Sequence, residues 1–166
     1  MLKCCKAGLS LLSALLLLGA LHGQAYAIAK YRQQPTQMTV ANEAMEVFSI
    51  VNRERKAQGL SPLVLDKELM EAAAIRAREL PRNYSHTRPD GTSCFTVLKY
   101  HNAYKGENIA AGYPNSRAAM DGWMHSPGHR ANILNPKFTK IGIGYVYEPN
   151  SKYRHYWTQL FLSRDF

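Results

Sequence analysis

The sequence has no apolar run long enough to span a membrane. Its longest, from Leu9 to Leu21, falls short of the roughly 18 to 20 residues that a transmembrane helix needs. Lys3 and Lys6 precede this run, and Ala25-Tyr26-Ala27 follows it. A basic start, a short apolar centre and an A-x-A site are typical of a secretory signal peptide. We therefore predict that residues 1–27 are cleaved and that the protein is exported, to the periplasm or outside the cell.

Cysteine is also scarce. Of the 3 cysteines, Cys4 and Cys5 lie in the predicted signal peptide, so Cys94 is the only thiol after cleavage and an intramolecular disulfide is excluded. We expect Cys94 to be a small, buried apolar side chain in a core held by packing alone. A catalytic thiol is the alternative, although the local sequence supplies no basic neighbour to activate it.

Internal repeats and low-complexity tracts are absent as well. Removal of the signal peptide leaves 139 of the 166 residues, enough for one domain with its own core. Residues 28–38 have no period and contain a proline, so we expect a flexible tail there and a single domain over residues 39–166. We expect a monomer, with a dimer through Cys94 only if that side chain is exposed.

Acidic residues are fewer than basic ones. Without the signal peptide, 19 Lys and Arg stand against 12 Asp and Glu, a balance that favours anionic partners such as an anionic membrane surface or acidic glycans. The basic residues are scattered, without the motif or interleaved aromatics of a nucleic-acid reader. We therefore expect no nucleic-acid partner, and we interpret the basic residues as a solvated face.

Apolar spacing predicts helices in the first two thirds of the domain. A helical period runs from about Thr39 to Gly59, and a second one follows Asp66, a favourable N-cap residue, as far as Pro81. Three shorter helices are expected around residues 94–100, from Asn115 or Ser116 through Trp123, and from the cap residue Ser126 to Leu134.

The period changes in the C-terminal part. Ile141–Glu148 and Tyr153–Leu162 are rich in β-branched and aromatic residues and are joined through Pro149-Asn150-Ser151, which predicts an antiparallel hairpin. We assign no strand to the Gly-rich segment KGENIAAGYP. Since helices precede strands, the predicted fold class is α+β, with helices packed on a small antiparallel sheet.

Three polar residues stand out at the expected margins of elements: His86 in YSHTRPDG, Glu107 in GENIA and His129 in SPGHRANIL. His129 lies in the first turn of its helix, where the macrodipole favours the neutral imidazole. Two neutral imidazoles and one carboxylate suit a divalent metal such as zinc, or a base that activates water without a metal. Their spacing is too wide for a local motif, so their convergence depends on the fold.

Five motifs occur in the following order within about residues 42 to 162: VNRERKAQGLSPLVLDKELMEAAAIRA, YSHTRPDG, GENIA, WMHSPGHRANILNPKFTKIGIGYVY and YWTQLF. In these motifs and their order, the chain resembles the CAP superfamily of cysteine-rich secretory, antigen 5 and pathogenesis-related proteins, especially its small bacterial members. The resemblance implies an α-β-α sandwich with a large central cleft, faced by a polar cluster of His86, Glu107 and His129.

The chain departs from the family's eukaryotic members at two points. Where many of them carry a second acidic residue, three positions after the tryptophan, this chain has Ser126, so the cluster is a triad at most. The disulfides and the cysteine-rich extension of the animal proteins are also absent, and the ion-channel activities attributed to that extension are not transferred.

Three functions remain open. The first is a secreted binding module that holds a divalent metal, most suitably zinc, at His86, His129 and Glu107 and accepts a lipid, sterol-like or glycan ligand in its cleft. The second is a metal-assisted hydrolase or protease with Glu107 as general base. The third is a structural or host-interaction protein whose polar cluster only stabilises the fold.

Overall fold

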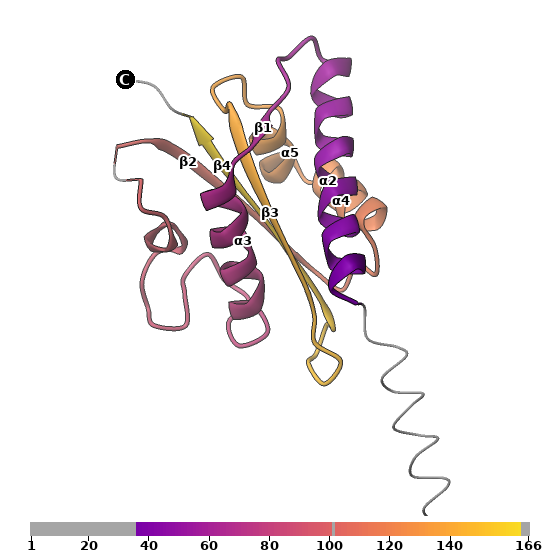
Figure 1. Ribbon diagram of the computed structural model, residues 1–166, viewed down its shortest axis with the longest axis vertical. Helices are drawn as coiled ribbons and strands as arrows, with labels where there is room; N and C mark the ends of the chain where they lie inside the picture. The colour runs from indigo at the N-terminus through magenta and orange to yellow at the C-terminus, as the bar shows by residue number, and fades with distance from the viewer. Residues whose placement is uncertain (1–35, 101, 164–166) are drawn as a thin grey trace, which may run out of the picture. The chain divides into compact units, whose positions relative to one another are not determined.

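The computed structural model describes residues 36–100 and 102–163 (Figure 1). The predicted signal peptide and most of the predicted tail lie outside the described residues. The first helix within the described residues begins at Gln37, two residues before the start that we expect at Thr39. The elements are α2 (Gln37–Ala57), β1 (Val64–Leu65), α3 (Lys67–Glu79), the 3-10 helix η1 (Cys94–Val97), β2 (Tyr104–Ala111), α4 (Ser116–His125), α5 (Pro127–Ile133), β3 (Lys140–Tyr147) and β4 (His155–Ser163).

The sheet has the strand order β1-β3-β4-β2. The hairpin of β3 and β4 confirms the predicted one, and β2 pairs antiparallel with the other side of β4. The two-residue strand β1 runs parallel to β3, so the sheet is mixed rather than purely antiparallel. Among the described residues, β2 is therefore an edge strand with one unpaired side.

Strand β2 corrects the prediction for the segment KGENIAAGYP. We assigned no strand there, whereas residues 104–111 pair with β4 along their whole length, and Glu107 lies in the middle of a strand rather than at a margin. The small residues that suggested a turn serve packing instead. A Cβ on Gly106 would lie 2.8 Å from the ring of Phe138, so glycine is required by the close approach of the chain that follows α5.

Helices cover both faces of the sheet, which confirms the α-β-α sandwich (Figure 1). Helix α3 packs on one face through Leu69 and Ala73, against Leu160 and Leu162 of β4. Helices α2, α4 and α5 pack on the other face. The core on that side contains Val51, Met120, Trp123, Ile133, Ile143, Trp157 and Phe161.

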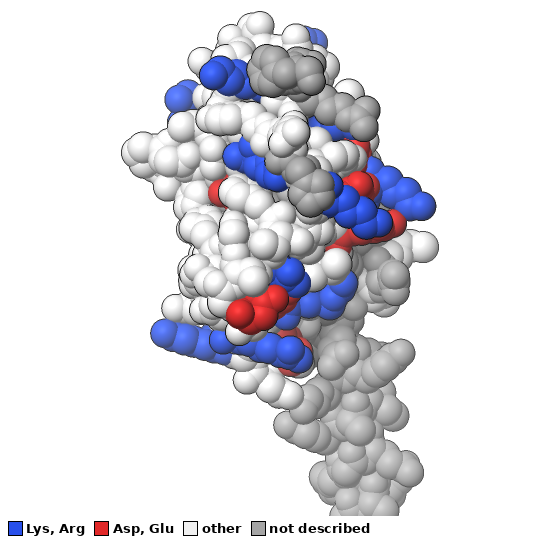
Figure 2. Space-filling view, turned by 90° about the vertical axis from the view of Figure 1, so that its left-hand side faces the viewer, with Lys and Arg blue, Asp and Glu red and all other residues white. Residues whose placement is uncertain are grey.

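Two arginines contradict the prediction of a wholly solvated basic face. Arg55 is 1% exposed and Arg76 is 0% exposed. The guanidinium of Arg55 donates to the carbonyls of Ser61, Ile133, Asn135 and Phe138, so its hydrogen-bonding capacity is met without a carboxylate. On the face at the left of Figure 1, the remaining Lys and Arg side chains lie scattered rather than in one patch (Figure 2).

In the part of the chain that the structure describes, no helix is both long and apolar enough to cross a membrane.

Candidate functional site

Glu107 is the centre of the candidate site. It projects from β2, is 6% exposed, and uses both carboxylate oxygens. Oε1 accepts a hydrogen bond of 2.8 Å from Nε of Arg76, and Oε2 lies 2.6 Å from Nδ1 of His86. Burial alone would raise the pKa of Glu107, but His86 and Arg76 together hold it below its ordinary value. The carboxyl group is therefore ionised at neutral pH.

Arg76 connects Glu107 to a longer chain of charges. Its Nη1 lies 2.7 Å from Oε2 of Glu79, and its Nη2 donates to the carbonyl of Ser85 at 2.7 Å. Glu79 in turn accepts three hydrogen bonds from Arg88, the shortest being 2.6 Å. This network fastens the loop that carries His86 to the end of α3.

Arg76 is a site residue that its sequence motif does not reveal. It falls seven residues after Leu69 and three after Ala73, on the apolar stripe of α3. A charged residue on such a stripe indicates a buried ion that needs a partner. The sequence therefore indicates a buried ion at Arg76, but it does not indicate that the partner is Glu107, 31 residues further along the chain.

His86 presents its ring to solvent while one nitrogen is fixed. Its side chain is 58% exposed, and its backbone is held by a hydrogen bond of 2.9 Å from the amide of Cys94 to the His86 carbonyl. Because the Glu107 carboxylate can only accept, Nδ1 of His86 carries the hydrogen. In the neutral ring, Nε2 then has a free lone pair for a ligand.

His129 lies in the first turn of α5 and is half-buried. Burial, with a smaller contribution from His86, lowers its pKa, which agrees with the expected neutral imidazole. Among the described residues, no hydrogen bond joins the His129 ring to His86 or Glu107, and the clustered ligand atoms around Glu107 do not include His129. Ser126 is the N-cap residue of α5, as predicted, but its side chain makes no capping hydrogen bond.

Two asparagines position His129 against β2. Asn108 donates to the carbonyl of His129 at 3.0 Å, and Asn132 donates to Oδ1 of Asn108 at 2.8 Å. Asn108 is fully buried in β2, so its amide connects the strand to α5 instead of bonding its own backbone in a turn. Asn132 also donates to the carbonyl of Glu107 at 3.3 Å, which gives it a structural role.

Cys94 lies beside the pair of His86 and Glu107. A ligand atom of each of these three residues lies within 4.8 Å of the other two, so they form a set of donors that could hold a metal ion. Burial and the neighbouring Glu107 raise the pKa of the Cys94 thiol to about 12. The thiol is protonated at neutral pH, which agrees with the predicted buried side chain rather than with a nucleophile.

A family model and several known proteins match this chain. The CAP family, described as the cysteine-rich secretory protein family, matches residues 48–161. The protein YkwD of Bacillus subtilis (strain 168) is 41% identical over 124 residues, covering 72% of this chain and 46% of YkwD. The secreted protein RBT4 of Candida albicans is 26% identical over 113 residues, covering 68% of this chain and 25% of RBT4. The chain thus spans less than half the length of these relatives.

Solved structures show the same fold. An extracellular protein containing an SCP domain from Bacillus anthracis str. Ames is 30% identical with a TM-score of 0.66, over 78% of this chain and 44% of that one. An outer surface protein from Borrelia burgdorferi also has a TM-score of 0.66, at 24% identity, over 75% of this chain and 94% of that one. The family match covers most of the sandwich and includes all three predicted site residues. The chain therefore belongs to the CAP, or cysteine-rich secretory protein, family.

Proposed function

We propose that this chain is an exported metal-binding protein that holds one divalent cation, most suitably zinc, between the imidazoles of His86 and His129. The observation that carries the proposal is the 2.6 Å contact between Glu107 and Nδ1 of His86. A carboxylate that holds one nitrogen of a histidine fixes the ring and its tautomer, an arrangement typical of histidines that ligate metals through the other nitrogen.

The contacts of Glu107 define its part in this site. Both of its oxygens already have partners, Arg76 and His86, so its main contribution is to orient His86 and to offset the charge of the cation. Its remaining lone pairs are available to the cation as a third ligand, as the sequence analysis expected. The bound cation would supply a positive centre for an anionic or carbonyl group of a ligand.

The same contacts favour binding over hydrolysis. A general base works best with a pKa near the operating pH, whereas Arg76 and His86 hold the pKa of Glu107 below its ordinary value. Glu107 is therefore a weak proton acceptor. Turnover that depends on the Glu107 carboxylate, abolished by Glu107→Gln in a protein that still binds metal, would favour the hydrolase instead.

Zinc titration by calorimetry, on the chain without residues 1–27, tests the metal site. We expect one zinc per chain, with binding abolished in His86→Ala and in His129→Ala. His125→Ala is the matched control, because His125 is exposed at the end of α4 and bonds only to Asp121 of its own helix. Absence of stoichiometric zinc, or equal binding by all three variants, would overturn the proposal.

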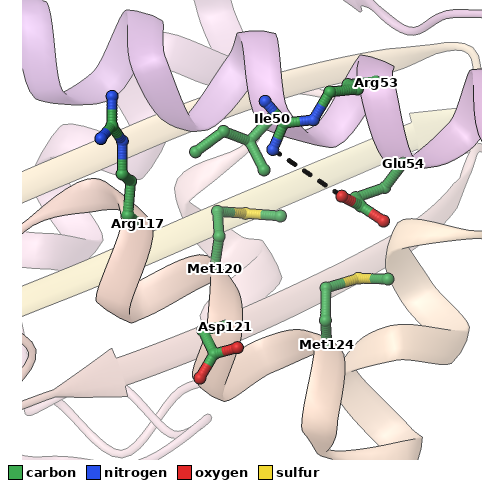
Figure 3. A pocket seen from close by; sticks show the side chains of 7 residues that line it. All are labelled: Ile50, Arg53, Glu54, Arg117, Met120, Asp121 and Met124. Atoms are coloured by element: carbon green, nitrogen blue, oxygen red, sulfur yellow. Dashed lines mark ion pairs between the residues drawn. The ribbon is translucent and has the colours of Figure 1, made fainter.

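We further propose that a lipid-like ligand lies in the groove between α2 and α4 (Figure 3). The groove has a volume of about 360 Å³ and is lined by the apolar side chains of Ile50, Met120 and Met124 together with Arg53, Glu54, Arg117 and Asp121. Arg53 pairs with Glu54 at 3.8 Å and Arg117 with Glu46 at 2.8 Å, so it is the three apolar side chains, which suit an acyl chain, that support a lipid-like ligand. A fluorescent fatty acid should bind to the protein, and the substitution Met124→Glu should weaken that binding. If the fatty acid does not bind, or if Met124→Glu leaves its affinity unchanged, the proposal of a lipid-like ligand is contradicted.

Export is supported by the relatives described as secreted, extracellular or outer-surface proteins. If residues 1–27 are a signal peptide, the secreted chain begins at Ile28, which mass spectrometry of the exported protein checks. A chain that retains Met1 after export would contradict the cleavage.

A further inference from the structure

Three exposed tyrosines gather at the end of the sheet where β2 ends and β4 begins. Tyr84, Tyr113 and Tyr153 are 47%, 36% and 38% exposed. They come from the segment after α3, from the loop between β2 and α4, and from the loop between β3 and β4. The rings of Tyr84 and Tyr153 lie 5.9 Å apart, and Gly112, the residue before Tyr113, lies against the Tyr153 ring. Three loops distant in sequence therefore build one aromatic surface, which we call the tyrosine cluster.

The fold holds the tyrosine cluster in place. Trp157 donates from Nε1 to the carbonyl of Tyr113 at 2.9 Å, and the Tyr113 ring lies against Gly122 of α4, where a Cβ would collide with it. Tyr153 packs edge-on against buried Tyr156, with ring centroids 6.2 Å apart. Because these contacts fix the rings before any ligand arrives, a ligand would lose little free energy in ordering them.

A polar groove lies between two of the same loops. It has a volume of about 580 Å³ and is lined by Arg78, Arg82, Glu148, Asn150 and Ser151, among others. Within residues 36–100 and 102–163, the guanidinium groups of Arg78 and Arg82 have neither a hydrogen-bond partner nor an ion pair. Lys152 follows the lining residue Ser151 in the chain, and its Nζ lies 5.0 Å from the centre of the Tyr153 ring. This end of the sheet therefore combines the tyrosine cluster with the unpaired guanidinium groups of two arginines, one carboxylate and one amide.

We propose that this end of the sheet binds a polysaccharide whose sugar rings carry carboxylate groups. The C–H face of a sugar ring packs on an exposed aromatic ring, and the free guanidinium groups can hold a carboxylate through two parallel hydrogen bonds. Glu148 and Asn150 can accept hydrogen bonds from sugar hydroxyls. The phosphodiester backbone of DNA has no hydroxyl donors for Glu148 and Asn150, so the groove favours an acidic glycan over DNA. The site is separate from the histidines and needs no metal.

Oligogalacturonate, in which every ring carries a carboxylate, is a direct probe. We expect saturable binding in calorimetry, unchanged by EDTA, and weakened at least about tenfold by Tyr84→Ala or Tyr153→Ala. Tyr104→Ala is the matched control. Tyr104 is 49% exposed and has Lys137 over its ring at 5.5 Å, but it begins β2, at the opposite end of the strand. Affinity of the Tyr104→Ala protein should be unchanged.

Three results would overturn this proposal and leave the proposed metal site unaffected. They are the absence of saturable oligogalacturonate binding, an equal loss of its affinity in Tyr104→Ala, and tighter binding of oligothymidylate than of oligogalacturonate. Thermal unfolding establishes that each variant folds. Gly122→Ala gives a second test, because it displaces the Tyr113 ring from α4 while leaving every tyrosine present, and it should weaken oligogalacturonate binding.

Discussion

At the scale of single residues, the buried pair of Arg76 and Glu107 determines how His86 is presented. The Arg76 guanidinium and the His86 imidazole each bond to a different oxygen of the Glu107 carboxylate. The orientation of the exposed His86 ring therefore depends on Arg76, which is fully buried. Such a pair contributes little net stability when intact, because both ions are desolvated, but removal of one partner leaves an uncompensated charge.

Replacement of Arg76 tests this dependence. Arg76→Ala should lower the free energy of unfolding by about 3–5 kcal/mol, because Glu107 would remain buried without its strongest cation. Arg78→Ala, two residues further along α3 and exposed, should change it by no more than about 0.5 kcal/mol. Urea unfolding of both variants measures the difference. Similar losses in the two proteins would show that the buried pair has no special role.

At the scale of elements, the contact between α3 and β3 positions Arg76 above Glu107. Gly142 and Gly144 face α3, and a Cβ on either would overlap the backbone of the helix, at Leu69 and at Ala73 respectively. The helix therefore lies directly on the strand, with no side chain between them. This close approach lets a side chain on α3 reach across the sheet to the edge strand β2.

Substitution at this contact should be costly. Gly144→Ala should destabilise the protein by about 3 kcal/mol or more, since backbone atoms of α3 cannot move aside as a flexible side chain can. Gly128→Ala is the control, because a Cβ there meets nothing within 4 Å and alanine favours a helix by about 0.5–1 kcal/mol. Thermal unfolding compares the two. Equal stability of both variants would contradict direct packing of α3 on β3.

At the scale of the whole molecule, three carboxylates that form ion pairs make the free energy of unfolding depend on pH. Burial opposes ionisation of Asp66 and Glu79, yet Lys140 on β3 and the arginines Arg88 and Arg76 hold their pKa values below the ordinary 3.8 and 4.5. Glu107 behaves in the same way. A depressed pKa contributes stability that is fully present above the ordinary value and is lost as pH falls through the folded-state value.

The free energy of unfolding should therefore be level near about pH 6 and fall steeply below about pH 4.5. Urea unfolding at a series of pH values measures the fall. Glu79→Gln should reduce its slope, because that variant has lost one of the titrating carboxylates. A free energy that stays constant down to about pH 3 would be inconsistent with these ion pairs.

The sequence predicted local features better than pairings between distant segments. The helices and the final hairpin can be predicted from the sequence because the spacing of apolar residues within each segment is enough to identify them. Strand β2 was not, since its glycine and alanines resemble a turn and only its pairing with β4 and packing against Phe138 make it a strand. Likewise, His86 and Glu107 stood out beside turn residues, whereas the burial of Asn108 depends on contacts with α5 and β4.

The most direct test of the account is the absorption spectrum of the protein titrated with Co²⁺, which takes the place of zinc and reports its own coordination geometry. A site built on the imidazoles of His86 and His129 predicts intense visible bands of a low-coordinate ion that saturate at one cobalt per chain and disappear in the His86→Ala/His129→Ala protein. Only the weak spectrum of hydrated cobalt, or bands that persist in the double variant, would contradict the claim that these histidines hold a metal.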